Sequence, residues 1–137
     1  QKRSELKTPA DLKAETEVIF GDTMGEMFFF CAMADVTLMG GSFENFGCQN
    51  VIEPASVGVP VIVGPSTFNF STVVERAISM GAVDQVQNAQ EAVDKAHLWL
   101  SNEEELKMRK DNARAFSQAY VGSTERHMKV LEELWQK

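Results

Sequence analysis

Three turns that contain glycine offer the backbone features that a phosphate-binding site needs. They are Gly21-Asp22, Gly40-Gly41-Ser42 and Gly64-Pro65, and each follows a short apolar segment. Glycine lets the backbone approach a ligand closely, and free amides beside a helix N-terminus suit an anion. None of the turns has the GxGxxG or GxxxxGK(S/T) spacing of dinucleotide and ATP sites. The pattern favours another kind of nucleotide or phosphate site, and a plain turn at the double glycine stays open as the alternative.

Two glutamates, Glu26 and Glu53, are candidate ligands for the hydroxyls of a sugar. Each stands three residues after a residue that can cap a helix, Thr23 in one case and Asn50 in the other. Such a capping box uses the glutamate to accept a backbone N–H at the start of a helix. A carboxylate can also accept two hydroxyls at once, which suits the diol of a ribose. We therefore expect helices to begin at Thr23 and Asn50, and both roles of the glutamates stay open.

The other reactive side chains indicate no metal site and no hydrolase. His97 and His127 are isolated and lack the spacing of metal ligands, and no serine lies in a G-x-S-x-G sequence. Cys31 and Cys48 lie far apart and outside any CxxC pattern. We expect both thiols to be small buried apolar groups of a protein from a reducing compartment. No metal and no cofactor are expected.

Length and charge limit the classes of partner. The chain has 137 residues, enough for one domain with its own core. Its 20 acidic residues outweigh 13 basic ones, and the net charge of −7 argues against nucleic acid as a partner. The most apolar run, residues 27–39, contains Asp35 and falls short of the ~20 residues of a membrane span. The polar opening at Gln1 indicates a soluble fragment of a longer protein.

Short apolar segments and amphipathic stretches alternate along the first part of the chain. The segments 18–20, 35–39, 60–63 and 82–86 predict four strands, of which the first should be buried. Helices are predicted from Thr23 to Ala34, from Asn50 to Ser56, and over the face of Val73, Val74, Ala77 and Ile78. Such alternation is typical of βαβ units, so we expect a Rossmann-like parallel sheet flanked by helices. Ligands of such sheets bind at the carboxyl ends of the strands.

A helical C-terminal tail is predicted to follow. Its three apolar faces are Ala92, Val93, Ala96 and Leu100, then Leu106, Ala113, Phe116 and Tyr120, then Met128, Leu131, Leu134 and Trp135. Ser101 or Asn102 should cap the second of these helices, and Gly122-Ser123 should separate it from the third.

The ordered motifs of the chain resemble the C-terminal domain of the Kdo (3-deoxy-D-manno-octulosonic acid) transferases. These motifs are GDTMGE at 21–26, GGS at 40–42, QNxxEP at 49–54 and GPxTFNF at 64–70. The resemblance covers roughly residues 17–80, and the helical tail fits in length and character only. None of these motifs is diagnostic by itself, and the signal lies in their order.

The resemblance implies a GT-B glycosyltransferase, in which two Rossmann-like domains face each other across a cleft. Residues 1–137 would be the single donor-binding domain, without the N-terminal acceptor domain. The donor would be CMP-Kdo, and the acceptor a lipid A precursor at the cytoplasmic face of the bacterial inner membrane. Membrane contact would come through the rest of the protein. The catalytic base would be a glutamate of the missing domain, so no catalytic residue is assigned in this chain.

The resemblance also implies two CMP-binding stretches, and the glycine-rich turn at 40–42 adds a third candidate segment. The predicted nucleotide-binding residues are Met24, Gly25, Glu26, Gly40, Gly41, Ser42, Asn50, Val51, Ile52 and Glu53. A further contact, a Pro-Arg pair, would lie upstream of this chain. Cys48 stands where the family often has glycine. If that position needed a positive φ, cysteine would strain the loop by about 1 kcal/mol.

Two alternatives remain at this point. The chain could be the donor domain of another GT-B sugar-nucleotide enzyme that uses a different nucleotide. It could also be a Rossmann-like interaction domain without a small-molecule site, because a fold does not fix a function.

Overall fold

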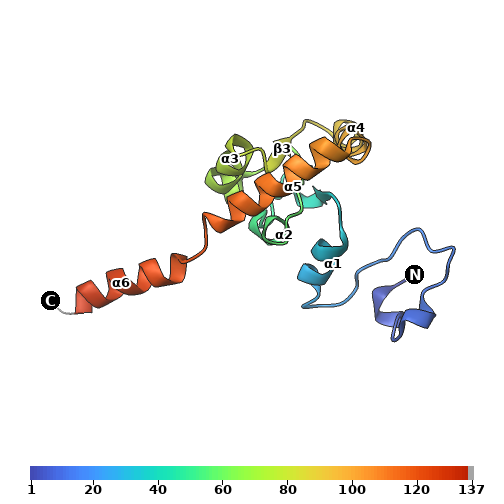
Figure 1. Ribbon diagram of the computed structural model, residues 1–137, viewed down its shortest axis with the longest axis horizontal. Helices are drawn as coiled ribbons and strands as arrows, with labels where there is room; N and C mark the ends of the chain where they lie inside the picture. The colour runs from blue at the N-terminus through green and yellow to red at the C-terminus, as the bar shows by residue number, and fades with distance from the viewer. Residues whose placement is uncertain (136–137) are drawn as a thin grey trace.

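The computed structural model describes residues 1–135 and contains a three-stranded parallel sheet flanked by helices (Figure 1). Strands β1 (Thr37–Met39), β2 (Val61–Val63) and β3 (Val83–Gln85) lie side by side in that order. Both strand pairs are parallel. The predicted parallel α/β fold is therefore confirmed, and its sheet has three of the four predicted strands.

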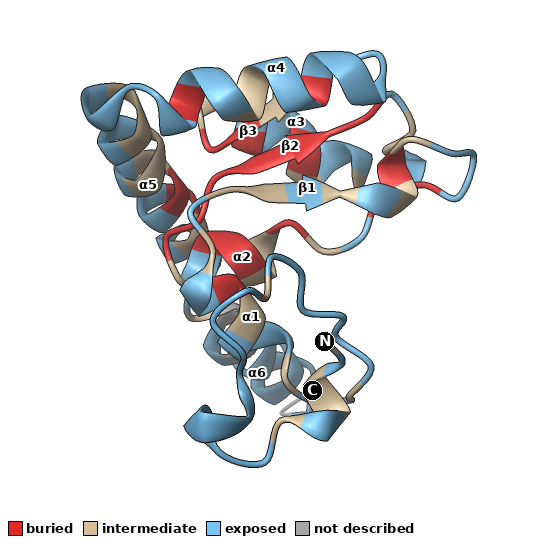
Figure 2. Cartoon of the chain, turned by 90° about the vertical axis from the view of Figure 1, so that its right-hand side faces the viewer, coloured by how far each residue is buried: buried red, intermediate tan, exposed pale blue. Residues whose placement is uncertain are grey.

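The middle strand, β2, is buried on both faces. Val61, Ile62 and Val63 have no exposed surface, and Ile62 lies between Leu38 of β1 and Asp84 of β3. A parallel strand covered on both faces needs apolar side chains in both directions, which this run supplies. Figure 2 shows β2 as the buried centre of the sheet, with helices on either side.

Four helices cover the two faces of the sheet (Figure 2). Helices α2 (Ile52–Ser56), α3 (Ser71–Ser79) and α5 (Glu103–Gln118) pack on one face, and α4 (Ala89–Leu100) packs on the other. This division follows from the alternation of side chains along a strand.

Alternate residues of β2 enter two separate cores. Val61 and Val63 pack with Phe116 of α5 in one core. Ile62 packs with Trp99 of α4 in the other. The predicted apolar face of α5 is thus confirmed. Ala113 and Phe116 are fully buried, and Leu106 and Tyr120 are partly buried against the cores.

The remaining elements lie around this body. They are α1 (Met27–Met33), α6 (Ser123–Trp135) and the 3-10 helices η1 (Arg3–Glu5), η2 (Pro9–Asp11), η3 (Gly40–Ser42) and η4 (Phe68–Phe70). Helix α6 confirms the predicted last helix and projects away from the sheet (Figure 1). Its apolar residues Met128, Leu131, Leu134 and Trp135 are exposed.

The prediction of a buried strand at residues 18–20 is wrong. Val18 and Phe20 are exposed, and Phe20 forms a single parallel bridge with Lys2 outside the sheet. A run of three apolar residues predicts burial only when an element is available to cover it. Here the first 20 residues fold on each other beside α1.

The prediction of a helix from Thr23 is also wrong, because α1 begins four residues later, at Met27. Gly25 has a φ of +81°, which no helical residue adopts. The carboxylate of Glu26 accepts from the hydroxyl of Thr23 and pairs with Arg3, so it does not cap the backbone. Thr23 and Glu26, which form a capping-box pattern in the sequence, thus bind each other, and Glu26 also binds Arg3.

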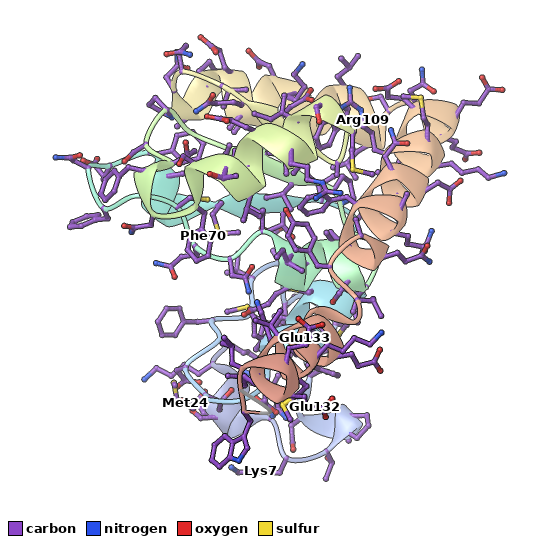
Figure 3. The ribbon with its side chains drawn as sticks, turned by 90° about the vertical axis from the view of Figure 1, so that its left-hand side faces the viewer. Lys7, Met24, Phe70, Arg109, Glu132 and Glu133 are labelled. Carbon is purple, nitrogen blue, oxygen red and sulfur yellow. The ribbon has the colours of Figure 1, made fainter. Side chains whose placement is uncertain are left out.

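Helix α4 presents a face to the sheet that matches the predicted one only in part. Ala92 is buried and Ala96 packs against the core, as predicted. Val93 and Leu100 are exposed, and Trp99 is buried in their place. The guanidinium of Arg109, labelled in Figure 3, lies 4.9 Å from the centre of the Trp99 ring. Burial of the large indole against the sheet outweighs the two aliphatic side chains.

The predicted start of α5 is confirmed, because the Asn102 side chain accepts the amide of Glu105. Helix α2 begins at Ile52, two residues later than predicted, with Val51 at its N-cap position, and the Asn50 side chain still accepts the amide of Ile52. The asparagines supply acceptors to amides that have no partner inside the helix.

Replacement of Trp99 tests the observed face of α4. Trp99→Ala removes a fully buried ring, so we expect it to lower the free energy of unfolding by about 3–5 kcal/mol. The control Val93→Ala changes a side chain that is 56% exposed and should stay within about 0.5 kcal/mol. Urea denaturation of both variants measures this, and equal losses would show that α4 is turned as the sequence pattern predicted.

Candidate nucleotide-binding site

The carboxyl ends of β1 and β2 are joined by the hydroxyl of Ser42. Its Oγ donates to the carbonyl of Met39 at 2.5 Å and accepts the amide of Gly64 at 2.6 Å. Ser42 has no exposed surface. Two of the predicted glycine-containing turns are therefore held against each other at the edge of the sheet where ligands of parallel sheets bind.

The close approach of these turns requires glycine at position 64. A Cβ added to Gly64 would lie 2.5 Å from the carbonyl oxygen of Ser42, which is backbone and cannot rotate away. The same oxygen accepts the amide of Ser66 at 2.9 Å. By contrast, a Cβ added to Gly40 would meet nothing within 4 Å. Gly64 is thus a packing residue, and Gly40 faces open space.

The loop that follows Ser42 is fixed by the GPxTFNF motif. The amide of Gly47 donates to the Ser66 hydroxyl at 3.1 Å, and the Asn69 side chain donates to the carbonyl of Phe46 at 2.9 Å. Gly47 has a φ of +74°, while Cys48 is buried with an ordinary φ. The strain considered for Cys48 is therefore absent, because the neighbouring glycine takes the left-handed conformation.

A cavity of about 410 Å³ opens between α1, β1 and α2. It is lined by Met27, Cys31, Thr37, Leu38, Met39, Gln49, Asn50, Glu53 and Pro54. This volume falls in the range of small-molecule sites, and the lining combines apolar walls with a few polar groups, as such sites do. Two predicted ligand residues, Asn50 and Glu53, are among the polar groups.

Asn50 holds Glu53 in place as well as capping α2. Its amide nitrogen donates to Oε1 of Glu53 at 3.2 Å, while its oxygen accepts the amide of Ile52 at 3.1 Å. Within residues 1–135 no side chain or amide donates to the second carboxylate oxygen of Glu53. The helix-cap role and the ligand role are thus compatible, because one oxygen stays available to hydroxyls from the cavity.

Cys31 forms part of the cavity wall next to Glu53. Burial raises the pKa of the Cys31 thiol, and the negative charge of Glu53 raises it further. Burial also raises the pKa of the Cys48 thiol. Both thiols are free and protonated at neutral pH, as expected for apolar packing residues.

The Met24-Gly25-Glu26 stretch lies at the start of α1, directly before the cavity residue Met27. The Met24 side chain is 97% exposed, and Figure 3 shows it on the outside of the N-terminal region. A Cβ added to Gly25 would meet nothing within 4 Å. The stretch therefore adjoins a cavity residue along the chain, but none of its three residues lines the cavity.

Three predicted site residues lie where their side chains do not face this cavity. Ser42 and Val51 are fully buried. Ile52 borders a different cavity of about 420 Å³ beside α5. Any contact of these residues with a nucleotide in the 410 Å³ cavity would come from backbone atoms. We assign the Ser42 side chain a positioning role.

A further cavity of about 580 Å³ was not predicted. It is lined by Phe43, Glu44, Asn45, Pro65, Ser66, Thr67 and Phe68. Its two walls are the loop after β1 and the loop after β2, so it also lies at the carboxyl edge of the sheet. The sequence signal for it was the position of GPxTFNF directly after a buried strand.

The part of the chain that the structure describes contains neither a cluster of metal ligands nor a membrane-spanning helix. Residues 1–135 hold no group of three or more histidine, cysteine or acidic side chains placed to bind a metal ion. No helix of the same residues has the length and hydropathy to cross a bilayer.

Comparison with known proteins decides the family. The family model described as "Glycosyl transferases group 1" matches residues 1–116. The chain belongs to the group 1 glycosyl transferases.

The relatives of this glycosyl transferase confirm the resemblance to Kdo transferases. The chain is 43% identical over 117 residues to the 3-deoxy-D-manno-octulosonic acid transferase of Bordetella pertussis, covering 85% of the chain and 27% of that protein. Against the enzyme of the same name from Haemophilus influenzae it is 35% identical over 98 residues, covering 72% and 23%. The chain thus spans about a quarter of the length of these curated relatives.

A solved structure confirms which part of such an enzyme the fold resembles. The C-terminal CMP-Kdo binding domain of WaaA from Acinetobacter baumannii matches with a TM-score of 0.78 and 34% identity. The match covers 86% of this chain and 60% of that one. The predicted fold, the C-terminal half of a GT-B glycosyltransferase with a helical end, is therefore confirmed.

A matched pair of glycine substitutions tests the contact between the two turns. Gly64→Ala places a methyl against the Ser42 carbonyl, so we expect a loss of about 1–3 kcal/mol in the free energy of unfolding. Gly40→Ala adds the same methyl to open space and should have little effect. Thermal unfolding measures both, and a tolerated Gly64→Ala would contradict the close approach.

Labelling of the two thiols tests their burial. Because their pKa values are raised, the thiolate is scarce at neutral pH and appears only as pH rises above the usual cysteine range. We expect labelling by a maleimide at pH 7 to be about tenfold or more slower in the folded chain than in urea. Cys31, at the cavity wall, should react before the fully buried Cys48. Fast labelling of both in the folded chain would show that the cavity wall is misplaced.

Proposed function

We propose that this chain is the donor-nucleotide domain of a Kdo transferase and that it binds CMP-Kdo. The observation that carries the proposal is the cavity between α1, β1 and α2, with Asn50 and Glu53 in its wall. It is supported by a domain of similar fold that is described as CMP-Kdo binding. The full set of site residues put forward is Met24–Glu26, Gly40–Ser42 and Asn50–Glu53, with Ser42 acting through its backbone and by positioning the loop.

Of the two candidate glutamates, Glu53 fits the ribose better. Its carboxylate lines the cavity and has one oxygen without a donor among residues 1–135. Both carboxylate oxygens of Glu26 already have partners, Arg3 and Thr23. A carboxylate with an available oxygen can accept a ribose hydroxyl at little cost of rearrangement. Glu26 would then meet the donor from the segment before α1.

The rest of the reaction belongs to parts of the protein outside this chain. On this proposal the chain positions CMP and stabilises the charge that develops as CMP leaves. A second domain supplies the general base and the acceptor, a lipid A precursor at the cytoplasmic face of the inner membrane. No metal or other cofactor takes part. The chain alone should therefore show no transfer from CMP-Kdo, and turnover by it would contradict this division of labour.

The direct test is a titration of the labelled chain with CMP, UMP and AMP, followed by backbone NMR. We expect CMP to shift the amides of Asn50–Glu53 and of residues at the start of α1, with weaker responses to UMP and AMP. An equal response to all three would favour a group 1 enzyme with another donor. No response in this chain or in a longer one that includes the upstream residues would refute the donor site.

Substitution of Glu53 tests whether its carboxylate contributes to CMP binding. Glu53→Gln keeps the shape but loses the charged acceptor, so CMP binding should weaken by about tenfold or more, since hydrogen bonds to charged groups contribute about 1.5–3 kcal/mol. Glu75→Gln, on the exposed side of α3, is the matched control and should bind CMP like the unaltered chain. Equal affinities of all three proteins would remove Glu53 from the site.

A further inference from the structure

The segment before α1 is tied to the nucleotide site by Arg3. Its Nη2 lies 2.7 Å from Oε1 of Glu26, and its Nη1 donates to the carbonyl of Leu6 at 2.7 Å. Both side chains are about three-quarters buried. The guanidinium is therefore held between its own segment and a residue 23 positions further along the chain.

The backbone of the same segment is anchored beside this ion pair. The amide of Arg3 donates to the carbonyl of Phe20 at 2.8 Å. Ser4 donates to the Asp22 carboxylate with both its amide, at 2.9 Å, and its hydroxyl, at 2.7 Å. These hydrogen bonds lower the pKa of Asp22. The start of the chain is thus fastened to the turn that precedes Glu26 by two independent contacts.

The side chain of Glu26 has no support from α1. The backbone carbonyl of Glu26 accepts the amide of Phe30 at 3.1 Å, but its side chain caps no amide, and Gly25 before it has a φ of +81°. Its carboxylate position is set by the donors that reach it, Arg3 on Oε1 and the Thr23 hydroxyl on Oε2. Without Arg3, a carboxylate in this position has several rotamers open to it.

We propose that Arg3 is a positioning residue of the donor site, which fixes the orientation of the Glu26 carboxylate, one residue before the cavity residue Met27, for contact with the bound nucleotide. This inference rests on the proposed function, and it adds the N-terminal segment to the site. Arg3 acts through Glu26 and need not touch the ligand. An arginine suits this role because its fork can bind a carboxylate and a carbonyl together, which a lysine cannot do in the same geometry.

The test measures CMP affinity of four variants by NMR titration or calorimetry. Arg3→Ala should weaken CMP binding by about fivefold, the upper range for a partly exposed ion pair. Arg3→Lys should recover part of this loss, because it keeps the charge but not the fork. Glu26→Gln should weaken binding as well. In the double variant Arg3→Ala/Glu26→Gln, the arginine change should add nothing further, since its effect passes through Glu26.

Ser4→Ala is the control for a general loosening of the segment. It removes a hydroxyl contact to Asp22 and leaves the Arg3–Glu26 pair intact. If Ser4→Ala weakens CMP binding as much as Arg3→Ala, or if the two effects of Arg3 and Glu26 are additive, the positioning role is refuted. If the unaltered chain binds CMP and Arg3→Ala binds it equally well, this inference fails while the proposed function stands. If neither this chain nor a longer one binds CMP, both fail.

Discussion

The arrangement of the candidate site depends on one buried hydroxyl, that of Ser42. It bridges the carbonyl of Met39 and the amide of Gly64, and so joins the ends of two neighbouring parallel strands. An unpaired buried polar group is costly, so both partners are fixed once the hydroxyl is buried. The loops that leave these strands stay joined beyond this point by the Gly47–Ser66 and Phe46–Asn69 hydrogen bonds. The 580 Å³ cavity lies between the two loops, and the 410 Å³ cavity adjoins the first of them at Gln49 and Asn50.

The proposed binding of an anionic donor to an acidic domain relies on local contacts. The chain carries a net charge of −7, so no overall attraction draws a nucleotide to it. Near the 410 Å³ cavity, each acidic side chain has a defined arrangement. Glu53 is oriented by Asn50, and Glu26 is neutralised by Arg3. Such pairing limits repulsion of a phosphate while keeping a carboxylate oxygen for hydroxyls.

Sequence patterns predicted the elements whose structure is determined locally. The buried run at β2, the asparagine cap at Asn102 and the class of fold were all found as expected. The predictions failed where contacts with residues far away in the sequence determine the local structure. Glu26 binds Arg3 instead of capping a helix, and Trp99 turns α4 toward the sheet. The cavity residues Met27 and Cys31 gave no sequence signal, because apolar residues that line a site look like core residues.

The most direct measurement of the central claim is a crystal structure of the chain with CMP bound. The account predicts the nucleotide in the cavity between α1, β1 and α2, with a ribose hydroxyl within hydrogen-bond distance of the Glu53 carboxylate and the Glu26 carboxylate still paired with Arg3. A nucleotide bound instead between the loops that carry Phe43 and Phe68, without any contact to Glu53, would contradict it.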